Sequence, residues 1–364
     1  MNDKLSNRLH FYYMDALRIF ACLAVIFNHT NERGFMRLST DDLGSISFFI
    51  DVVMSTACKV GVPLFFMMSG ALLIKKEEPL KKTLMRIPRI LFDLVLFTFL
   101  YYIVDAWLLG QEFSVSSTLT IMLASNYWHL WYLYAYIVLV ISLPVLRKMV
   151  KGLDESTSKY LIVLAFFFMG IFPILSKISP SGINDNLNLA WLTENVFIYP
   201  ILGYILENVI PEDFFDKAKI IKLWVLNIAC FIVSALCEYF FLLEKVGKED
   251  TTNGYFDERF LINFCIVNAI TLYVTARFIF KNIKMNDLIK NLLQEVGKDT
   301  FGIYLLHIWF LWKIPFLFAI WTKIEHTGAI GYHFGILLSC ILTFVCAGVV
   351  TSVLRRLPVV KKLF

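Results

Sequence analysis

Long apolar runs alternate with shorter polar segments along the whole chain. The runs are about 20 residues long, which is the length that an α-helix needs to cross the hydrocarbon core of a bilayer. A bilayer admits only helices or closed barrels, and runs of this length select helices. The pattern therefore predicts an all-α, polytopic integral membrane protein with about ten transmembrane helices. These helices are expected at residues 13–31, 49–74, 88–109, 128–146, 160–178, 190–208, 221–243, 260–280, 300–321 and 332–353.

Composition supports this class and indicates a single domain. Of the 364 residues, 58% are hydrophobic and only 17% are charged, and the mean hydropathy is +0.68. A soluble domain of this size does not carry so much apolar sequence. We expect one membrane-embedded domain over residues 1–364 with no appended soluble domain, because the longest polar connection covers only residues 244–259.

The distribution of Lys and Arg predicts the orientation of the helices. In an N-in, C-in topology the segments that face the cytoplasm hold 24 of the 34 Lys and Arg residues, and the opposite loops hold seven. Cytoplasmic loops of membrane proteins carry an excess of these residues. Both termini are therefore expected inside. The net charge of +5 is modest, and no nucleic-acid partner is expected.

The seven cysteines all lie within apolar stretches. This placement argues against a disulfide framework, and their spacing matches no metal-ligand motif. They are interpreted as small core residues, and no metal site is expected.

The first apolar run carries polar residues at both ends. Asp15 and Arg18 lie near its start, and Asn28 and His29 close it. On a helix, Arg18 and His29 share one face about 16 Å apart along the axis, and Asp15 can pair with Arg18. Ionisable side chains at membrane depth usually face a polar cavity, so the run predicts a functional site. Alternatively, Arg18 only marks the cytoplasmic end of the helix by snorkelling, and His29 only marks its outer end.

Two further stretches lie toward the cytoplasmic side. Small residues around Ser69 permit close helix approach, and Ser69 lacks the Gly-x-Ser-x-Gly context of a nucleophile. Arg86 and Arg89, three residues apart in the basic loop 75–89, can bind phosphates. A basic loop at this place is also expected from topology alone.

The fourth and ninth runs carry histidines among aromatic residues. His129 and Trp131 open the fourth run, where aromatic side chains are usual at the outer membrane interface. Tyr304 and His307 belong to the ninth run, and His307 lies about half-way along it. A histidine at that depth needs a partner, so it either lines a reaction chamber or makes a hydrogen bond between helices.

Six short patterns occur in order along the chain and carry a family resemblance. They are Asp15-x-x-Arg18, the ten residues between Arg18 and His29, Val62-Pro-Leu-Phe-Phe-Met-Met-Ser-Gly70, Arg86-x-x-Arg89, His129-Leu-Trp-Tyr-Leu133 and Gly302-Ile-Tyr-Leu-Leu-His307. In these patterns the chain, from about residue 10 to residue 354, resembles the membrane acyltransferase-3 family. Within that family it is most similar to the stand-alone O-acetyltransferases of the enterobacterial common antigen type.

The resemblance implies a multi-pass enzyme of the cell inner membrane. Such an enzyme moves an acyl group, often acetyl, from cytoplasmic acetyl-CoA to a hydroxyl of an extracytoplasmic carbohydrate or glycan, without a metal. His29 would be catalytic, either as a general base or as a nucleophile that forms an acyl-imidazole. Arg18, Arg86 and Arg89 would bind the donor. Membrane lipid is a further expected partner, and a homo-oligomer is possible. The supporting residues would be Asp15, Asn28, Ser69, His129, Trp131, Tyr304 and His307.

Two other classes of function stay open from the residues. A transporter or flippase of a lipid-linked or acylated substrate would also line a polar path with buried Arg, His and Lys. A sensor-like protein would use the same pocket for binding without turnover. Hydrolysis or transfer of acyl-CoA by the purified protein distinguishes the enzyme from both.

Overall fold

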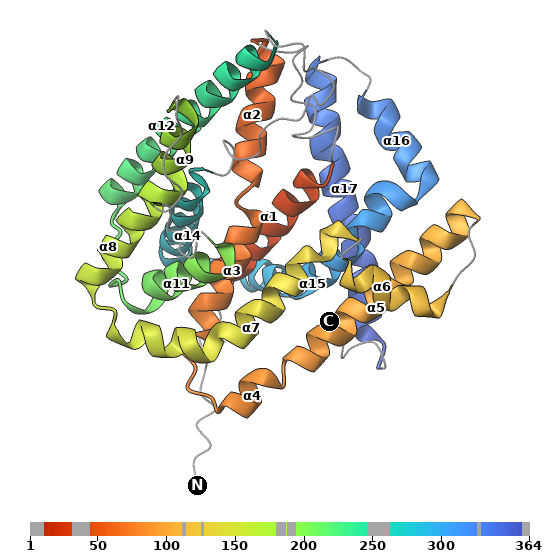
Figure 1. The fold of residues 1–364 in the computed structure, drawn as a ribbon, viewed down its shortest axis with the longest axis horizontal. Coiled ribbons are helices and arrows are strands. Elements are labelled where there is room, and N and C mark those ends of the chain that lie inside the picture. The colour runs from red at the N-terminus through yellow and green to blue at the C-terminus, as the bar shows by residue number, and fades with distance from the viewer. Residues whose placement is uncertain are drawn as a thin grey trace.

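A computed structural model of the chain describes residues 11–30, 44–110, 114–124, 127–179, 187, 194–246, 263–325 and 329–358. Within these ranges every regular element is a helix, and no strand occurs (Figure 1). The α-helices are α1 (Tyr12–Asn28), α2 (Ile46–Cys58), α3 (Gly61–Leu73), α4 (Leu80–Leu84), α5 (Ile87–Leu109), α6 (Val115–Leu123), α7 (Trp131–Met149), α8 (Glu155–Phe166), α9 (Phe172–Ile178), α11 (Asn195–Asn208), α12 (Lys217–Val246), α14 (Cys265–Asn282), α15 (Asp287–Ile308), α16 (Pro315–Glu325) and α17 (Ala329–Arg356). A π-helical segment, Phe167–Ile171, joins α8 to α9, and a second one, Trp309–Lys313, follows α15.

Six helical segments of the described ranges are long and apolar enough to cross a membrane. They are Ile46–Leu73, Leu80–Leu109, Trp128–Gly152, Glu155–Ser176, Lys217–Phe241 and His333–Arg356, and they coincide with six of the ten expected spans. The all-helical membrane class is therefore confirmed. The count of ten spans and the N-in, C-in orientation stay predictions.

Three of the other four expected spans fall on α1, α11 and α14, whereas the expected span 300–321 covers the end of α15, the π-helical segment and the start of α16, so it is not one continuous α-helix. α1, α11, α14 and α15 lie in the interior of the bundle. α1 packs against α2, α3, α14, α15 and α17, and α3 packs along α11 (Figure 1). α1 has 17 residues, which gives a length of about 26 Å, less than the hydrocarbon core of a bilayer. A helix that other helices surround does not need the continuous apolar surface that lipid demands, so it can carry polar residues.

The second expected span is one run in sequence but two helices in space. α2 ends at Cys58 and α3 begins at Gly61. Pro63 has no N–H group to continue the ladder of hydrogen bonds across this point. Side-chain amides compensate at the break, because Asn268 donates to the Ala57 carbonyl at 3.3 Å and Asn28 donates to the Cys58 carbonyl at 3.0 Å. The break therefore anchors the end of α1 to the α2–α3 junction.

α3 and α11 pack backbone against backbone, and glycines make this approach possible. A Cβ on Gly203 would lie 1.9 Å from the Met67 carbonyl oxygen, and one on Gly70 would lie 2.0 Å from the Pro200 carbonyl oxygen. The atoms that an added Cβ would meet belong to the backbone of the facing helix, so no flexible side chain could move aside to make room. Small residues allow helices to pack closely in membranes, and here they hold the centre of the bundle together.

Gly203→Ala should therefore destabilise the protein. Overpacking typically costs 1–3 kcal/mol, and a contact with backbone belongs at the upper end, about 3 kcal/mol. Thermal unfolding of the purified protein in detergent measures the change. The control is Gly152→Ala, because nothing lies within 4 Å of the Cβ that it would add. Equal stability of the two variants would contradict the close α3–α11 contact.

Candidate functional site

His29 lies directly after the last residue of α1. Its backbone N–H donates to the carbonyls of Val25 and Ile26, which ends the helix, and its own carbonyl accepts from Trp312 Nε1 at 2.9 Å. The side chain is only 7% exposed, and the Trp128 ring meets it edge-on at 4.8 Å between centroids. The imidazole is therefore held in an aromatic enclosure rather than in open solvent.

His307 of α15 is the hydrogen-bond partner of the His29 ring. His29 Nδ1 lies 2.5 Å from His307 Nε2, and the two ring planes are 17° apart with their centroids at 4.8 Å, so the rings meet edge to edge. His307 Nδ1 lies 2.5 Å from the Tyr304 carbonyl oxygen. A carbonyl oxygen only accepts, so His307 Nδ1 must carry a proton.

This chain of hydrogen bonds fixes the tautomer of His29. In neutral His307 the proton on Nδ1 leaves Nε2 as an acceptor, so His29 Nδ1 must be the donor between the two rings. Neutral His29 then carries its lone pair on Nε2. That nitrogen is the atom that can take a proton or attack a carbonyl.

His129 and Tyr304 complete this end of the site. The Tyr304 hydroxyl donates to the His129 carbonyl oxygen at 2.7 Å. The His129 ring is 2% exposed, and its centroid lies 6.1 Å from that of His307 and 4.5 Å from that of Tyr101. Its Nε2 is buried and has no hydrogen-bond partner within the described ranges. The fold thus brings the fourth and ninth apolar runs together around His29. Trp131, the other residue predicted from the fourth run, is 39% exposed instead.

Asp15 and Arg18 lie in the N-terminal half of α1, away from His29. Arg18 Nη1 donates to Asp15 Oδ1 at 2.7 Å, and Asp15 is buried while Arg18 is partly exposed. Gly297 of α15 packs directly on this carboxylate, because a Cβ there would lie 2.8 Å from Asp15 Oδ1. The pair expected from the sequence is present, and α15 holds its acidic member in place.

Arg18, Arg86 and Arg89 all lie within electrostatic range of the Tyr136 hydroxyl on α7, and the Ser69 side chain interacts with it too. Segments far apart in sequence therefore place three positive charges within range of one hydroxyl group. The sequence predicted the arginines but gave no signal for Tyr136.

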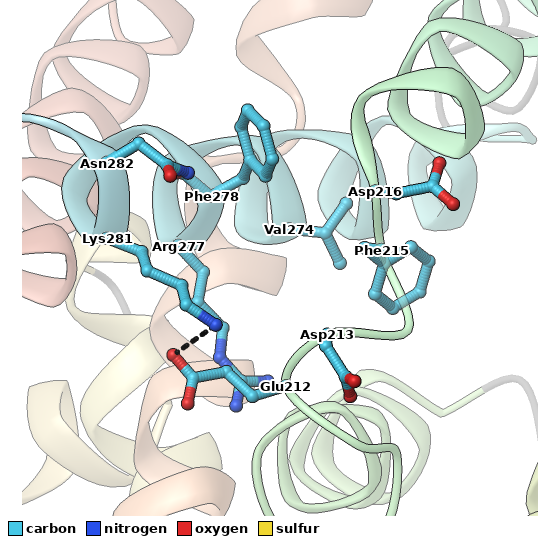
Figure 2. Close-up of a pocket in the computed structure, with 9 residues that line it drawn as sticks. All are labelled: Glu212, Asp213, Phe215, Asp216, Val274, Arg277, Phe278, Lys281 and Asn282. Carbon is cyan, nitrogen blue, oxygen red and sulfur yellow. Dashed lines mark hydrogen bonds and ion pairs between the residues drawn. The ribbon is translucent and has the colours of Figure 1, made fainter.

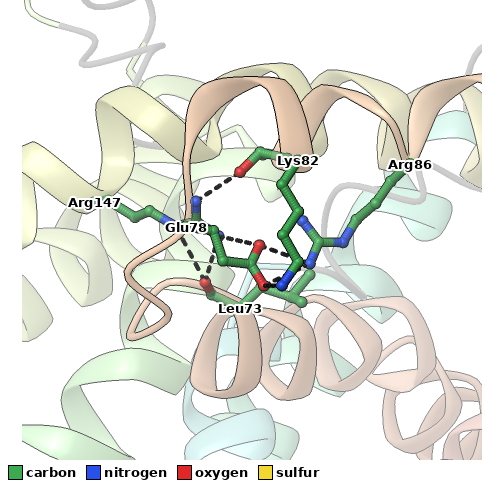
Figure 3. A network of polar contacts seen from close by, with 6 residues as sticks. Leu73, Glu78, Lys82, Arg86 and Arg147 are labelled. Carbon is green, nitrogen blue, oxygen red and sulfur yellow. Dashed lines mark hydrogen bonds and ion pairs between the residues drawn. The ribbon is translucent and has the colours of Figure 1, made fainter.

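Arg86 also belongs to a polar network that sequence reasoning missed (Figure 3). Its Nη2 donates to both carboxylate oxygens of Glu78, at 2.7 and 3.0 Å. Arg147 lies on the other side of Glu78, with 3.5 Å between Nη2 and Oε2, and also donates to the Leu73 carbonyl. The Arg86 hydrogen bonds, with further help from Lys82 and Arg147, hold the pKa of Glu78 below its usual range.

A separate pocket of about 200 Å³ lies between the α11–α12 connection and the end of α14 (Figure 2). Glu212 and Lys281 pair across it at 3.4 Å. Its acidic residues Asp213 and Asp216 outnumber the remaining cation, Arg277. This balance of charges does not favour an anionic ligand, and none of the predicted site residues lines it. Within the part of the chain that the structure describes, no three His, Cys, Asp or Glu side chains are grouped to hold a metal.

The fold and this site define a helical membrane protein with a buried histidine pair at the C-terminal end of α1 and an arginine–aspartate pair in the N-terminal half of the same helix. The family model described as an acyltransferase domain matches residues 11–352. The chain therefore belongs to the membrane acyltransferase-3 family and is a membrane acyltransferase. No curated protein and no solved structure matches it.

Proposed function

We propose that the protein transfers an acyl group, acetyl in the simplest case, from acyl-CoA to a hydroxyl of an extracytoplasmic carbohydrate or glycan. The observation that carries the proposal is the hydrogen-bonded pair of His29 and His307 at one end of α1, with Arg18 at the other end. Family membership supplies the reaction class. The choice of acetyl, of a glycan acceptor and of an inner-membrane location follows the resemblance to O-acetyltransferases, including those of the enterobacterial common antigen type.

The chemistry needs one lone pair, and His29 Nε2 supplies it. As a general base, Nε2 takes the proton of the acceptor hydroxyl while the hydroxyl oxygen attacks the thioester carbonyl. The carbon–sulfur bond then breaks, and the departing CoA sulfur takes the proton from Nε2. As a nucleophile, Nε2 attacks the thioester carbonyl first, the carbon–sulfur bond breaks, and CoA leaves as a thiolate from a cationic acyl-imidazole that keeps its Nδ1 proton. The acceptor oxygen then displaces the imidazole, which returns as neutral His29, and the hydroxyl proton passes through solvent to balance the one that the thiolate takes up.

The donor enters from the end of α1 that carries the arginines. A charged nucleotide does not cross the hydrocarbon core, so its phosphates stay with Arg18, Arg86 and Arg89 while the acyl-bearing arm extends along the central helix. Eleven residues separate Arg18 from His29, which corresponds to about 16 Å along the axis. The acceptor hydroxyl then approaches His29 from the outer side.

The direct test is release of CoA thiol by the purified protein in detergent. With acetyl-CoA alone we expect slow hydrolysis, and with a panel of glycosides and oligosaccharides we expect faster thiol release together with a product heavier by one acetyl group. A transporter, a flippase or a sensor would bind acetyl-CoA or a lipid without releasing thiol. Absence of both hydrolysis and acetylated product, in protein that still binds acetyl-CoA, would overturn the enzyme proposal.

The orientation has a test of its own, because Lys and Arg predict that residues 75–89 and 281–299 are cytoplasmic. Single cysteines at positions 80 and 285, in a variant without the native cysteines, should react with an impermeant maleimide only after the cells are opened. A cysteine at position 250 should react in intact cells. Labelling of position 80 or 285 from outside would reverse or break the predicted topology.

A further inference from the structure

Glu78 lies in the linker between α3 and α4, and the network around it contains three cations. Arg86 binds both of its oxygens, Arg147 approaches at 3.5 Å and Lys82 at 4.0 Å. The Glu78 side chain is only 11% exposed. The preceding residue, Glu77, is 87% exposed and pairs only with Lys151, at 3.3 Å, within the described ranges. The two neighbouring glutamates have the same side chain and lie in the same linker. They differ because Glu78 is enclosed by three cations, whereas Glu77 is exposed and contacts one lysine.

The Glu78 contact leaves part of the Arg86 guanidinium uncommitted. A guanidinium has five N–H donors in a rigid plane, and both hydrogen bonds to Glu78 come from Nη2. Nη1 is buried and has no partner within the described ranges. A buried donor without a partner costs free energy, so an acceptor on Nη1 would relieve this cost. Because Glu78 is bound through Nη2, that acceptor and the carboxylate would not compete for the same nitrogen.

Arg147 fixes the position of Glu78 from the other side. It lies on α7 and donates to the last residue of α3, Leu73, at 3.1 and 3.3 Å, and to Thr83 of α4 at 2.7 Å (Figure 3). A single planar side chain thus ties together both ends of the linker that carries Glu78. Arg147 is itself mostly buried, with 10% of its side chain exposed.

The Glu78 carboxylate offsets repulsion among the positively charged arginine side chains of this region. Arg86, Arg18 and Arg89 all lie within electrostatic range of the Tyr136 hydroxyl, and like charges repel one another. Asp15 restrains Arg18 from one side, and Glu78 restrains Arg86 from another. Its pKa is lowered by the Arg86 hydrogen bonds, so Glu78 is ionised at neutral pH. The restraint persists above the ordinary carboxyl pKa and is lost only as the pH falls through the lowered value.

We propose that Glu78, held in turn by Arg147, is a positioning residue that presents the Nη1 edge of Arg86 to a phosphate group of the acyl-CoA donor. This role rests on the proposed function, because it assumes that the donor phosphates bind at the arginines. The alternative role for the same carboxylate is a plug that competes with the phosphates for Arg86. The two roles predict opposite changes in donor affinity when the carboxylate is removed.

The decisive variant is Glu78→Gln, studied with two donors. Acetyl-CoA carries the phosphates, whereas acetyl-pantetheine carries the same thioester arm without them. Loss of one charge-assisted contact should raise the Kd of acetyl-CoA about tenfold, and the turnover at saturating donor should stay within about twofold. The affinity for acetyl-pantetheine should not change. Glu77→Gln is the matched control and should leave both affinities at their wild-type values.

Glu78→Asp guards against a variant that fails to fold, because it keeps the charge. It should recover part of the acetyl-CoA affinity that Glu78→Gln loses. Tighter binding of acetyl-CoA by Glu78→Gln would overturn the proposal in favour of the plug. An equal loss for acetyl-CoA and acetyl-pantetheine would also overturn it, since the effect would then be structural. If the wild-type protein binds neither donor, it is the proposed function that fails.

Discussion

Purified His29→Gln protein should fold, bind acetyl-CoA and lose acyl transfer. A general base is typically worth about 10²–10⁴ in rate, and loss of a covalent nucleophile can cost more. Glutamine keeps a polar side chain of similar reach, so the hydrogen bond to His307 can be replaced. It offers no basic nitrogen, so the lone pair that the His29 tautomer leaves on Nε2 is lost. The proposed site of the donor phosphates lies away from His29, so their binding should not change.

Donor affinity and turnover measured on the same sample test this expectation. The control is His333→Gln, because His333 is a histidine outside the His29–His307 pair. It lies on α17, is largely enclosed, and contacts Asp51 of α2 at 3.2 Å. The His333→Gln protein should still transfer the acyl group. Substantial transfer by His29→Gln would exclude His29 as base or nucleophile. Loss of donor binding together with activity would instead make it a residue that positions the donor.

The two chemical roles of His29 differ in an observable intermediate. With acetyl-CoA and no acceptor, a nucleophilic His29 would release thiol in a burst of about one per enzyme and leave an acetyl group on the protein. If His29 is a general base, thiol is released without a burst, at the slow rate at which water attacks the thioester in place of the acceptor. Intact-protein mass spectrometry after rapid mixing separates the two, with His29→Gln as the blank.

The helical membrane class could be predicted from the sequence because lipid imposes a strong and local pattern. Wherever a helix faces lipid, as in Lys217–Phe241 or His333–Arg356, the apolar run and the observed segment agree closely. The interior helices were harder to define. α11 has 14 residues and a proline inside, and neighbouring helices rather than hydropathy decide where such a helix begins and ends.

The site was predicted to the extent that its contacts are local. Asp15 and Arg18 are three residues apart and pair as expected. Arg86 and Glu78 are eight residues apart across a linker, and Arg147 joins them from a distance of more than sixty residues. Helical spacing contains no signal for such contacts. The bond between His29 and His307 spans 278 residues, so its existence, and the tautomer that it sets, required the three-dimensional structure.

His307→Leu should slow transfer about 10²-fold while donor affinity stays at its wild-type value. The leucine cannot accept the proton on His29 Nδ1, so the His29 ring loses both its preferred tautomer and the hydrogen bond that orients it. Misplacement of a reacting group by about 1 Å costs on this scale. The lost hydrogen bond between helices should also lower stability by about 0.6–2 kcal/mol.

A second substitution separates orientation of the ring from general support of the fold. The carbonyl oxygen of Gln can stand close to where His307 Nε2 lies and can accept from His29 Nδ1, so His307→Gln should recover about tenfold of the transfer that His307→Leu loses. Thermal unfolding shows whether stability recovers along with it. Recovered stability without recovered transfer would mean that His307 itself reacts with the substrate. Full activity and wild-type stability in His307→Leu would exclude both roles, because the bond to His29 would then contribute to neither the reaction nor the fold.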